Sequence, residues 1–432
     1  MKVNSEIIEI SKLPEKWQSI KLNQIASVKG RIGFRGYTKS DLVQKGNGAL
    51  TIGAKHINKN NKLNFIDPEY ISWEKYEESP EIKVEIGDIL MVQRGSLGKV
   101  AIVKELSEPA TINPSMVLLK NINCCNQFLY YSLSGEIIQK EIEKITTSTA
   151  VPMISQGQIK EFIILLPPLP EQQKIATILS TVDEKIEVID AQITQTRELK
   201  KGLMQKLLTR GIGHTKFKDS VLGEIPEGWE VVKLGSISDK VTDGSHFSPI
   251  PQKDTGYLIA TVKDMRFKQF NLSTCVHISK EEYEVLARNG CSPKREDILL
   301  SKDGTIGKTF VYKGDQNLVL LSSIAIIRLN TALAFPDYVC QFLKSDIFFK
   351  QLEGLTSGSA IRRLVLKAIN GIKVILPNIE EQEKIAITLS TIDDKIEILQ
   401  EKKKNYQELK KGLMQELLTG KVRVFQPELE IA

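Results

Sequence analysis

The sequence LPPLPEQQKIATILSTVDEKIEVIDAQITQTRELKKGLMQKLLTRG occupies residues 166–211, and a close copy, LPNIEEQEKIAITLSTIDDKIEILQEKKKNYQELKKGLMQELLTGK, occupies residues 376–421. The second copy begins 210 residues after the first and aligns with it without a gap, with about half of the positions identical. An internal repeat of this kind outranks other sequence signals, because overlooking it assigns the wrong fold. The chain is therefore organised as two halves in tandem.

Each copy predicts one long helix. Pro170 suits the first helical turn, and Glu171 places negative charge at the positive end of the helix dipole. Apolar residues then recur at alternating steps of three and four, which predicts a coiled-coil seam: Ile175, Leu179, Val182, Ile186, Ile189 and Ile193 in the first copy, and Ile385, Leu389, Ile392, Ile396 and Leu399 in the second. We expect the seam to weaken at Thr196 and Lys403 and to resume at Leu199, Leu203 and Leu207.

The two stripes predict that the helices pack on each other. Two copies of one surface complement each other under a twofold operation, so an antiparallel pair with an internal pseudo-twofold axis is expected. The alternative is that each helix packs only against its own domain.

The segments before the helices are also duplicated, though more loosely. LPEKWQSIKL at residues 13–22 returns as IPEGWEVVKL at 225–234, and GDILMVQRGSLGKVAIV at 87–103 returns as EDILLSKDGTIGKTFVY at 296–312. Short apolar runs bounded by turn residues predict strands at 49–52, 89–92, 100–103, 116–119, 258–262, 298–300, 309–312 and 324–329. One helix is expected at 127–145 and its counterpart at 336–352.

These patterns predict an α+β protein with two globular domains separated by two long helices. The expected divisions are a first globular domain at 1–165, a central helix at 166–211, a second globular domain at 212–375, a C-terminal helix at 376–421 and a tail at 422–432.

The amino-acid composition limits the classes of function and of binding site that the chain can have. The 432 residues are 41% hydrophobic and carry a net charge of +6, a modest basic excess that permits nucleic-acid binding without requiring it. The spacing of the five cysteines and four histidines indicates neither a disulfide framework nor a metal site. No leader is apparent and the longest apolar run is too short to span a bilayer, so a cytoplasmic protein is expected.

Three motifs that could suggest catalysis have simpler explanations. Residues 304–309, GTIGKT, lack the glycine that a phosphate loop needs six positions before Lys308, and a glycine hairpin accounts for them. Residues 113–116, NPSM, lack the second proline and the aromatic residue of an adenine methyltransferase loop. Glu81-Ile-Lys83 matches the end of a nuclease motif, but this short pattern is common in charged chains. We therefore expect neither a catalytic residue nor a metal site in this chain.

Basic and amide-rich loops in both globular domains are candidates for DNA contact. Arginine and lysine suit guanine edges and phosphates, and asparagine suits adenine. The alternative for each residue is an ordinary solvated charged face. The candidates are Lys29, Arg31, Arg35, Tyr37, Lys39, His56, Asn58, Lys59 and Arg94 in the first domain, and Lys240, His246, Lys263, Arg266, Lys268, Lys302, Arg362 and Arg363 in the second.

The pattern LPPLPEQQKIA…LSTVDEKI…LKKGLMQKLL, its second copy, and the Pro-x-x-Trp opening of each domain resemble the specificity subunit of type I restriction-modification systems. The second copy departs from the first in having Asn378 and Glu380 in place of Pro168 and Pro170.

The resemblance implies two target recognition domains that each read half of a bipartite DNA site, held apart by an antiparallel coiled coil. It further implies a non-catalytic chain that binds double-stranded DNA together with two modification subunits and two restriction subunits. S-adenosylmethionine, ATP and Mg would then be bound by those partners, with no cofactor in this chain. Two other functions stay open: a chain that itself methylates or cuts DNA, and a coiled-coil adaptor without DNA contact.

Overall fold

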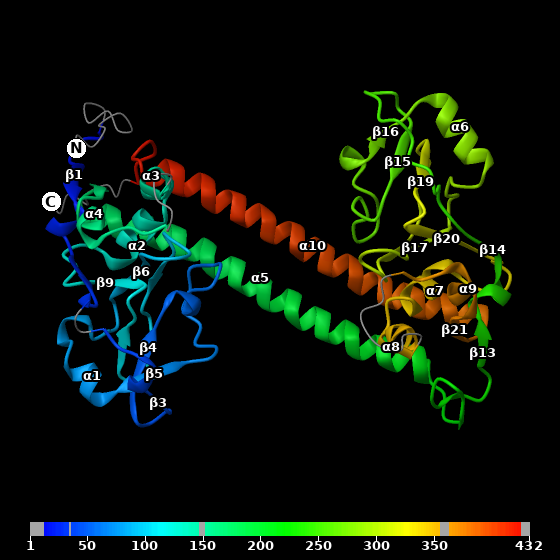
Figure 1. Ribbon diagram of the computed structural model, residues 1–432, viewed down its shortest axis with the longest axis horizontal. Helices are drawn as coiled ribbons and strands as arrows, with labels where there is room; N and C mark the ends of the chain where they lie inside the picture. The colour runs from blue at the N-terminus through cyan, green and yellow to red at the C-terminus, as the bar shows by residue number, and fades with distance from the viewer. Residues whose placement is uncertain (1–12, 34–35, 147–151, 355–362, 425–432) are drawn as a thin grey trace, which may run out of the picture. The chain divides into compact units, whose positions relative to one another are not determined.

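The computed structural model describes residues 13–33, 36–146, 152–354 and 363–424. The chain forms two compact units. Unit 1 comprises Met1–Ile189 and Lys402–Ala432, and unit 2 comprises Asp190–Glu401. Two long helices, α5 (Leu169–Arg210) and α10 (Ile379–Leu417), each contribute one part to each unit. Each unit thus contains one globular domain, the start of the helix that follows it and the end of the other helix (Figure 1).

The described residues of unit 1 form two four-stranded sheets and one two-stranded ribbon. The first sheet has the order β2 (Ser27–Gly30), β9 (Met116–Lys120), β6 (Ile89–Val92), β7 (Val100–Ile102). The second has the order β3 (Leu42–Val43), β5 (Glu69–Ser72), β4 (Gly48–Ile52), β8 (Ala110–Ile112). The ribbon pairs β1 (Gln18–Lys21) with β10 (Ile163–Leu166), and the helices are α1 (Trp73–Glu77), α2 (Asn126–Ser134), α3 (Glu136–Thr146) and α4 (Gln156–Lys160).

The first sheet of unit 1, which contains β6, is the central layer of the domain and is buried on both faces. Successive strand side chains point to opposite faces, and here both sets are apolar. Ile89 and Met91 of β6 pack with the helices, including α2 and the paired ends of α5 and α10. Leu90 and Val92 pack against the second sheet. The domain is therefore layered as helices, sheet, sheet.

Unit 2 repeats this plan. Its central sheet has the order β14 (Ser238–Asp243), β20 (Ile324–Leu329), β17 (Ile298–Ser301), β18 (Thr309–Val311). A smaller sheet has the order β16 (Val276–His277), β15 (Leu258–Ala260), β19 (Leu318–Leu320). Two ribbons pair β13 (Glu230–Lys233) with β21 (Lys373–Leu376) and β11 (Phe217–Lys218) with β12 (Ile225–Pro226), and the helices are α6 (Lys280–Arg288), α7 (Pro336–Phe342), α8 (Asp346–Gly354) and α9 (Leu366–Gly371).

The predicted strands are confirmed, but the two predicted short helices are each split. Where one helix was expected at 127–145, α2 and α3 meet at Gly135, and α7 and α8 likewise replace one helix at 336–352. Gly135 is the C-cap residue of α2, and its backbone N–H donates to the Ser132 carbonyl. This hydrogen bond ends the helix and lets the chain change direction.

The coiled coil is present as an antiparallel pair in each unit (Figure 1). The residues of the two predicted apolar stripes, Ile175 to Ile193 and Ile385 to Leu399, are buried except Ile392, which is half-buried; where the seam was expected to resume, Leu207 is buried and Leu203 half-buried. One detail of the predicted seam is wrong: Leu199 is 56% exposed, and Lys200 takes the inward position. A step of three or of four after Thr196 leads to Leu199 or to Lys200, and hydrophobicity alone favours the leucine.

The glycine motifs are hairpins, as predicted. Residues 302–308 connect the antiparallel strands β17 and β18, and the corresponding loop in unit 1 connects β6 and β7. A phosphate loop instead leads from a strand into a helix. Among the described helices, none is long and apolar enough to cross a membrane.

Candidate nucleic-acid interface

A buried glutamate at the start of α5 fixes the first globular domain to its helix. The indole Nε1 of Trp17 donates to Glu171 Oε2 at 3.1 Å, and the Arg423 guanidinium donates to both carboxylate oxygens at 2.8 and 2.9 Å. Burial raises the pKa of Glu171, but the hydrogen bonds from Arg423 and Trp17 outweigh it and hold this pKa below its ordinary value. The repeated tryptophan of the domain opening is thus an attachment point.

Unit 2 contains the same attachment with one substitution. The indole of Trp229 donates to Glu381 Oε2 at 3.0 Å, and His214 Nε2 lies 2.9 Å from Glu381 Oε1. Gly211, at φ +63°, follows the end of α5, and a Cβ there would lie 2.5 Å from the Trp229 ring. The attachment therefore requires glycine at this position both for backbone conformation and for space.

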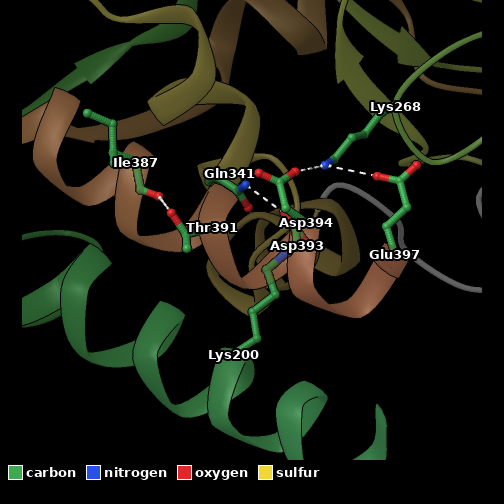
Figure 2. Close-up of polar contacts among 8 residues, drawn as sticks. All are labelled: Lys200, Lys268, Gln341, Ile387, Thr391, Asp393, Asp394 and Glu397. Atoms are coloured by element: carbon green, nitrogen blue, oxygen red, sulfur yellow. Dashed lines mark hydrogen bonds and ion pairs between the residues drawn. The ribbon is translucent and has the colours of Figure 1, made fainter. Parts of the chain in front are cut away.

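A lysine from a loop of each globular domain contacts the helix further along. Lys62 forms an ion pair with Glu187 of α5 in unit 1. In unit 2, Lys268 pairs with Asp394 and Glu397 of α10, as Figure 2 shows. Glu187 and Glu397 occupy equivalent positions in the two repeats. Each domain thus contacts its helix at a second point besides the buried glutamate.

In unit 1, four of the predicted DNA-contact residues have exposed side chains. They are Lys29, Lys39, Lys59 and Arg94. Arg94 lies at the β6–β7 hairpin, where its Nε donates to Met153 Sδ at 3.0 Å. Tyr37 and Asn58 are half-buried, and Asn58 Oδ1 accepts hydrogen bonds from the backbone of residues 60 and 62.

In unit 2, five predicted residues have exposed side chains. They are Lys240, His246, Lys263, Arg266 and Arg363. His246 and Arg363 belong to one cluster, since His246 lies 3.3 Å from Asp243, Arg363 lies 3.3 Å from Asp303, and Lys302 contacts both aspartates. Arg35 and Arg362 lie outside the described residues.

Three of the predicted residues, Arg31, Lys302 and His56, are buried. Arg31 is 6% exposed and donates to the Ile112 carbonyl and to Thr111 Oγ1, both at 3.2 Å. Lys302 is 1% exposed and lies 3.1 Å from Asp243, inside the loop cluster. Buried charges are retained where they have partners, so these cations stabilise loops.

His56 is also buried, and burial lowers its pKa. Its Nδ1 accepts a hydrogen bond from the Gly53 backbone at 3.0 Å, as expected of a neutral imidazole. Lys268 is a different case, because it is partly exposed but its charge is paired with the helix carboxylates. Both residues are therefore poor candidates for phosphate contact.

Two observations concern metal binding and thiol chemistry in the described residues. No group of three or more His, Cys, Asp or Glu side chains within them could hold a metal ion. Burial raises the pKa of the Cys124 and Cys275 thiols to about 12 in each case, so neither is a thiolate nucleophile at neutral pH.

The sequence prediction missed the residues that hold the parts of each unit together. The sequence predicts only a helix-start charge for Glu171, and it does not single out Glu381, Asp183 or Asp393. The repeat carried a usable signal, because acidic residues kept identical in both copies flank a seam that is otherwise apolar. Their hydrogen-bond partners come from elsewhere in the chain and could not be assigned from sequence.

A family model described as the type I restriction modification DNA specificity domain matches the chain twice, over residues 14–196 and 226–408. The chain therefore belongs to this family, and it contains two copies of the domain.

Relatives match along nearly the full length. A protein of Methanocaldococcus jannaschii with the provisional name type I restriction enzyme MjaX specificity subunit is 31% identical, covering 98% of this chain and 97% of its own. The type I restriction enzyme EcoBI specificity subunit of Escherichia coli is 23% identical, covering 89% of this chain and 80% of its own.

Among solved structures, the type I restriction-modification system S subunit from M. genitalium is similar with a TM-score of 0.57 at 16% identity, covering 96% of this chain and 98% of that one. At this identity the similarity supports the fold.

Proposed function

We propose that this chain is the DNA-reading subunit of a type I restriction-modification complex. Residues 1–165 would read one half of a bipartite site and residues 212–375 the other. The helices at 166–211 and 376–421 would set the spacer between the half-sites, with residues 422–432 as a tail. The proposal rests on the two copies of the specificity domain, each attached to a helix by equivalent contacts.

The contrast between attachment and surface supports two different half-sites. Trp17 and Trp229 make the same bond to equivalent glutamates, whereas the exposed basic side chains differ in type and position. Arg94, for example, is replaced by Asp303 in the corresponding hairpin. Two domains mounted alike but differing in surface charge suit the reading of different sequences.

The helices also offer a surface that fits two copies of one partner. In unit 2, a groove of about 680 Å³ lies between Met204 and Gln205 of α5 and the start of α8. In unit 1, the equivalent Met414 and Gln415 of α10 line a groove of about 430 Å³ beside the start of α3. We propose that each groove receives the same segment of one modification subunit.

An exposed glycine in the same segment of each helix supports close approach by a partner. Gly202 and Gly412 lie inside their helices, and a Cβ at either would meet nothing within 4 Å. Glycine inside a helix is unfavourable by ~1 kcal/mol relative to alanine, and no contact within the described chain compensates for it. One turn away, Leu199 and Leu409 are 56% and 49% exposed, which adds apolar surface to the same helix face.

In this proposal the chain itself is not catalytic and works in the cytoplasm. Two modification subunits would carry S-adenosylmethionine, and two restriction subunits would use ATP and Mg. The rival in which this chain methylates DNA is tested by incubating purified chain, DNA and labelled S-adenosylmethionine. Label transferred to DNA without a partner would overturn the proposal.

The deciding experiment is genome-wide mapping of adenine methylation in cells with this chain and its modification subunit, compared with cells lacking only this chain. The expected result is loss of a split motif with a fixed spacer. Unchanged methylation while the subunits still associate would favour the adaptor function.

The role of the helices in setting the spacer has its own test. Inserting four helical residues at Gln192 should lengthen the spacer of the methylated motif and leave both half-sites unchanged, because each helical residue adds ~1.5 Å. An unaltered spacer would refute this role.

The adaptor function is also tested by charge reversal at Arg94 and Arg363, which are exposed. A DNA-reading subunit should lose DNA affinity while subunit assembly continues. An adaptor would show no change in DNA binding.

A further inference from the structure

A lysine interrupts the apolar seam of each long helix. In α5 the three-and-four spacing leads from Ile193 to Thr196 and then to Lys200, whose side chain is only 13% exposed. In α10 the equivalent residue is Lys410, 23% exposed. A single polar residue at a seam position is a known means of fixing the register of a coiled coil at some cost in stability.

In unit 2 the seam lysine has a specific partner on the other helix. Lys200 Nζ lies 2.7 Å from Asp393 Oδ1, and Asp393 Oδ2 accepts a hydrogen bond from Gln341 Nε2 at 2.9 Å. Figure 2 shows Lys200 of α5 and Gln341 of α7 both directed at this aspartate. The Asp393 side chain is 3% exposed. Burial lowers the pKa of Lys200, and its hydrogen bond to Asp393 acts in the opposite direction without fully offsetting this.

Unit 1 contains the equivalent pair. Lys410 Nζ lies 2.7 Å from Asp183 Oδ1, and the Tyr131 hydroxyl donates to Asp183 Oδ2 at 2.8 Å. Tyr131 occupies the position equivalent to Gln341 in the repeat. Both pairs require the same alignment of the two helices, because as many residues separate Asp183 from Lys200 as separate Asp393 from Lys410.

The apolar residues alone would specify this alignment weakly. If α10 slid along α5 by one heptad, apolar positions would again face apolar positions over much of the seam. Asp393, however, would then lie opposite Leu207 or Ile193, depending on the direction. Either slip would leave this buried carboxylate without the Lys200 ammonium, and an unpaired buried charge is strongly unfavourable.

The pair in unit 1 discriminates less. After a slip in one direction Asp183 would lie opposite Leu417, but in the other direction it would lie opposite Lys403, which could replace Lys410. Asp183 is also more exposed, at 23%. The Lys200–Asp393 pair is therefore the stricter of the two.

We propose that Lys200 and Asp393, held by Gln341, are positioning residues that select one register of the helix pair and thereby one spacer length. This inference rests on the proposed function, in which the helices set the spacer. Attraction between the helices then comes mainly from the apolar seam, and the choice among alignments comes from the ion pair.

The test removes the pair without leaving a charge behind. Lys200→Leu combined with Asp393→Leu replaces a buried ion pair by apolar residues, a change that is often tolerated or stabilising. Register is read in the full-length chain by a disulfide between Ile193→Cys and Gln400→Cys, which lie one heptad from the pair. We expect disulfide formation to fall about tenfold in the double-leucine background, the factor that corresponds to ~1.4 kcal/mol.

A charge exchange keeps the test informative if the leucine variant folds poorly. Lys200→Asp with Asp393→Lys keeps one cation and one anion. Gln341 Oε1 has no hydrogen-bond partner among the described residues, so it could accept from the new lysine. This variant should regain the disulfide. The matched control is Lys404→Gln with Glu408→Gln, an exposed pair within α10 whose loss should change nothing.

The same variants are then compared by the spacer of the methylated motif. The double-leucine variant should methylate unchanged half-sites at more than one spacing, and the charge exchange should restore one spacing. Undiminished disulfide formation in the double-leucine variant would overturn the inference. Failure of the proposed function would instead appear as methylation independent of the chain, while the disulfide assay still reports register.

Discussion

Replacing the exposed helix glycines by alanine should stabilise the chain and weaken its assembly, two effects of opposite sign. Gly202 lies in the α5 part of unit 2 and Gly412 in the α10 part of unit 1. Because an added Cβ meets no atom within 4 Å at either position, neither alanine should be strained. Each substitution should then recover the helix penalty of glycine, ~0.8–1.0 kcal/mol.

The two gains should add, because the glycines lie in different units and share no partners. The expected total is ~2 kcal/mol. For units of this size, 1 kcal/mol raises the unfolding midpoint by ~2–4 °C, so each substitution should shift the midpoint of its own unit by about that amount. Thermal unfolding followed by circular dichroism measures this change.

Assembly is measured by titrating the purified chain with the modification subunit in a calorimeter. If a partner helix approaches each glycine closely, an added methyl group should cost ~1–3 kcal/mol of binding free energy, as in other overpacked contacts. That range corresponds to a loss of affinity of ~5- to 150-fold.

Ala191 provides the matched control, because it is exposed on α5 and lies outside the grooves. Ala191→Gly should cost ~1 kcal/mol of stability and leave the affinity unchanged. If the alanine variants bind the modification subunit as tightly as the natural chain does, the glycines do not mark a docking surface. If the alanine variants are not more stable, the added Cβ atoms are not free of contacts at the two positions.

Three further outcomes follow from the contacts described above. Leu389→Ala, at a fully buried position of α10, should lower the free energy of unfolding by ~2–5 kcal/mol in a urea titration. The pKa of Glu171 is below its ordinary value in the folded chain, so its contribution to the free energy of unfolding is present above the unfolded pKa, ~4.3, and is lost as pH falls through the lowered value. Glu171→Gln should remove this part of the pH dependence of stability, which unfolding titrations between pH 5 and 3 measure. Lys302→Met should lower the thermal unfolding midpoint, because it leaves the Asp243 carboxylate without its buried cation. Arg94→Ala, at an exposed position, should leave this midpoint unchanged and weaken DNA binding measured by fluorescence anisotropy.

The repeat was enough to predict the long helices from their periodicity and their antiparallel pairing from the twofold relation of two like stripes, and short apolar runs were enough to predict the strands of the α+β domains. Ile385 and Leu389, for example, follow a three-and-four spacing, and both are fully buried. Periodicity could not decide between Leu199 and Lys200, because Leu199 lies three residues and Lys200 four residues after Thr196, and a seam allows either step. The lysine points inward because Asp393 is there to receive it, and that partner lies on the other helix.

The candidate interface was less predictable for a related reason. A loop rich in basic residues can present them to solvent or fold over them, and composition is the same in both cases. Arg31 is buried because the Ile112 carbonyl and the Thr111 hydroxyl, far away in sequence, accept its hydrogen bonds. Long-range acceptors of this kind are set by the packing of two sheets, which no local pattern encodes.

The three kinds of polar contact between the helices and their surroundings solve a problem that the apolar seam creates. Burial of apolar surface is nondirectional, so it holds two helices together without strongly preferring one alignment or one orientation of the attached domain. Hydrogen-bonded carboxylates are directional and lose much of their stabilisation when their partners move. Glu171 fixes the domain at the helix start, Glu187 fixes a loop further along, and Asp183 fixes the neighbouring helix. Equivalent carboxylates make the corresponding contacts in unit 2. The DNA-reading surfaces of the two domains can therefore differ while the attachment of each domain to its helix stays the same.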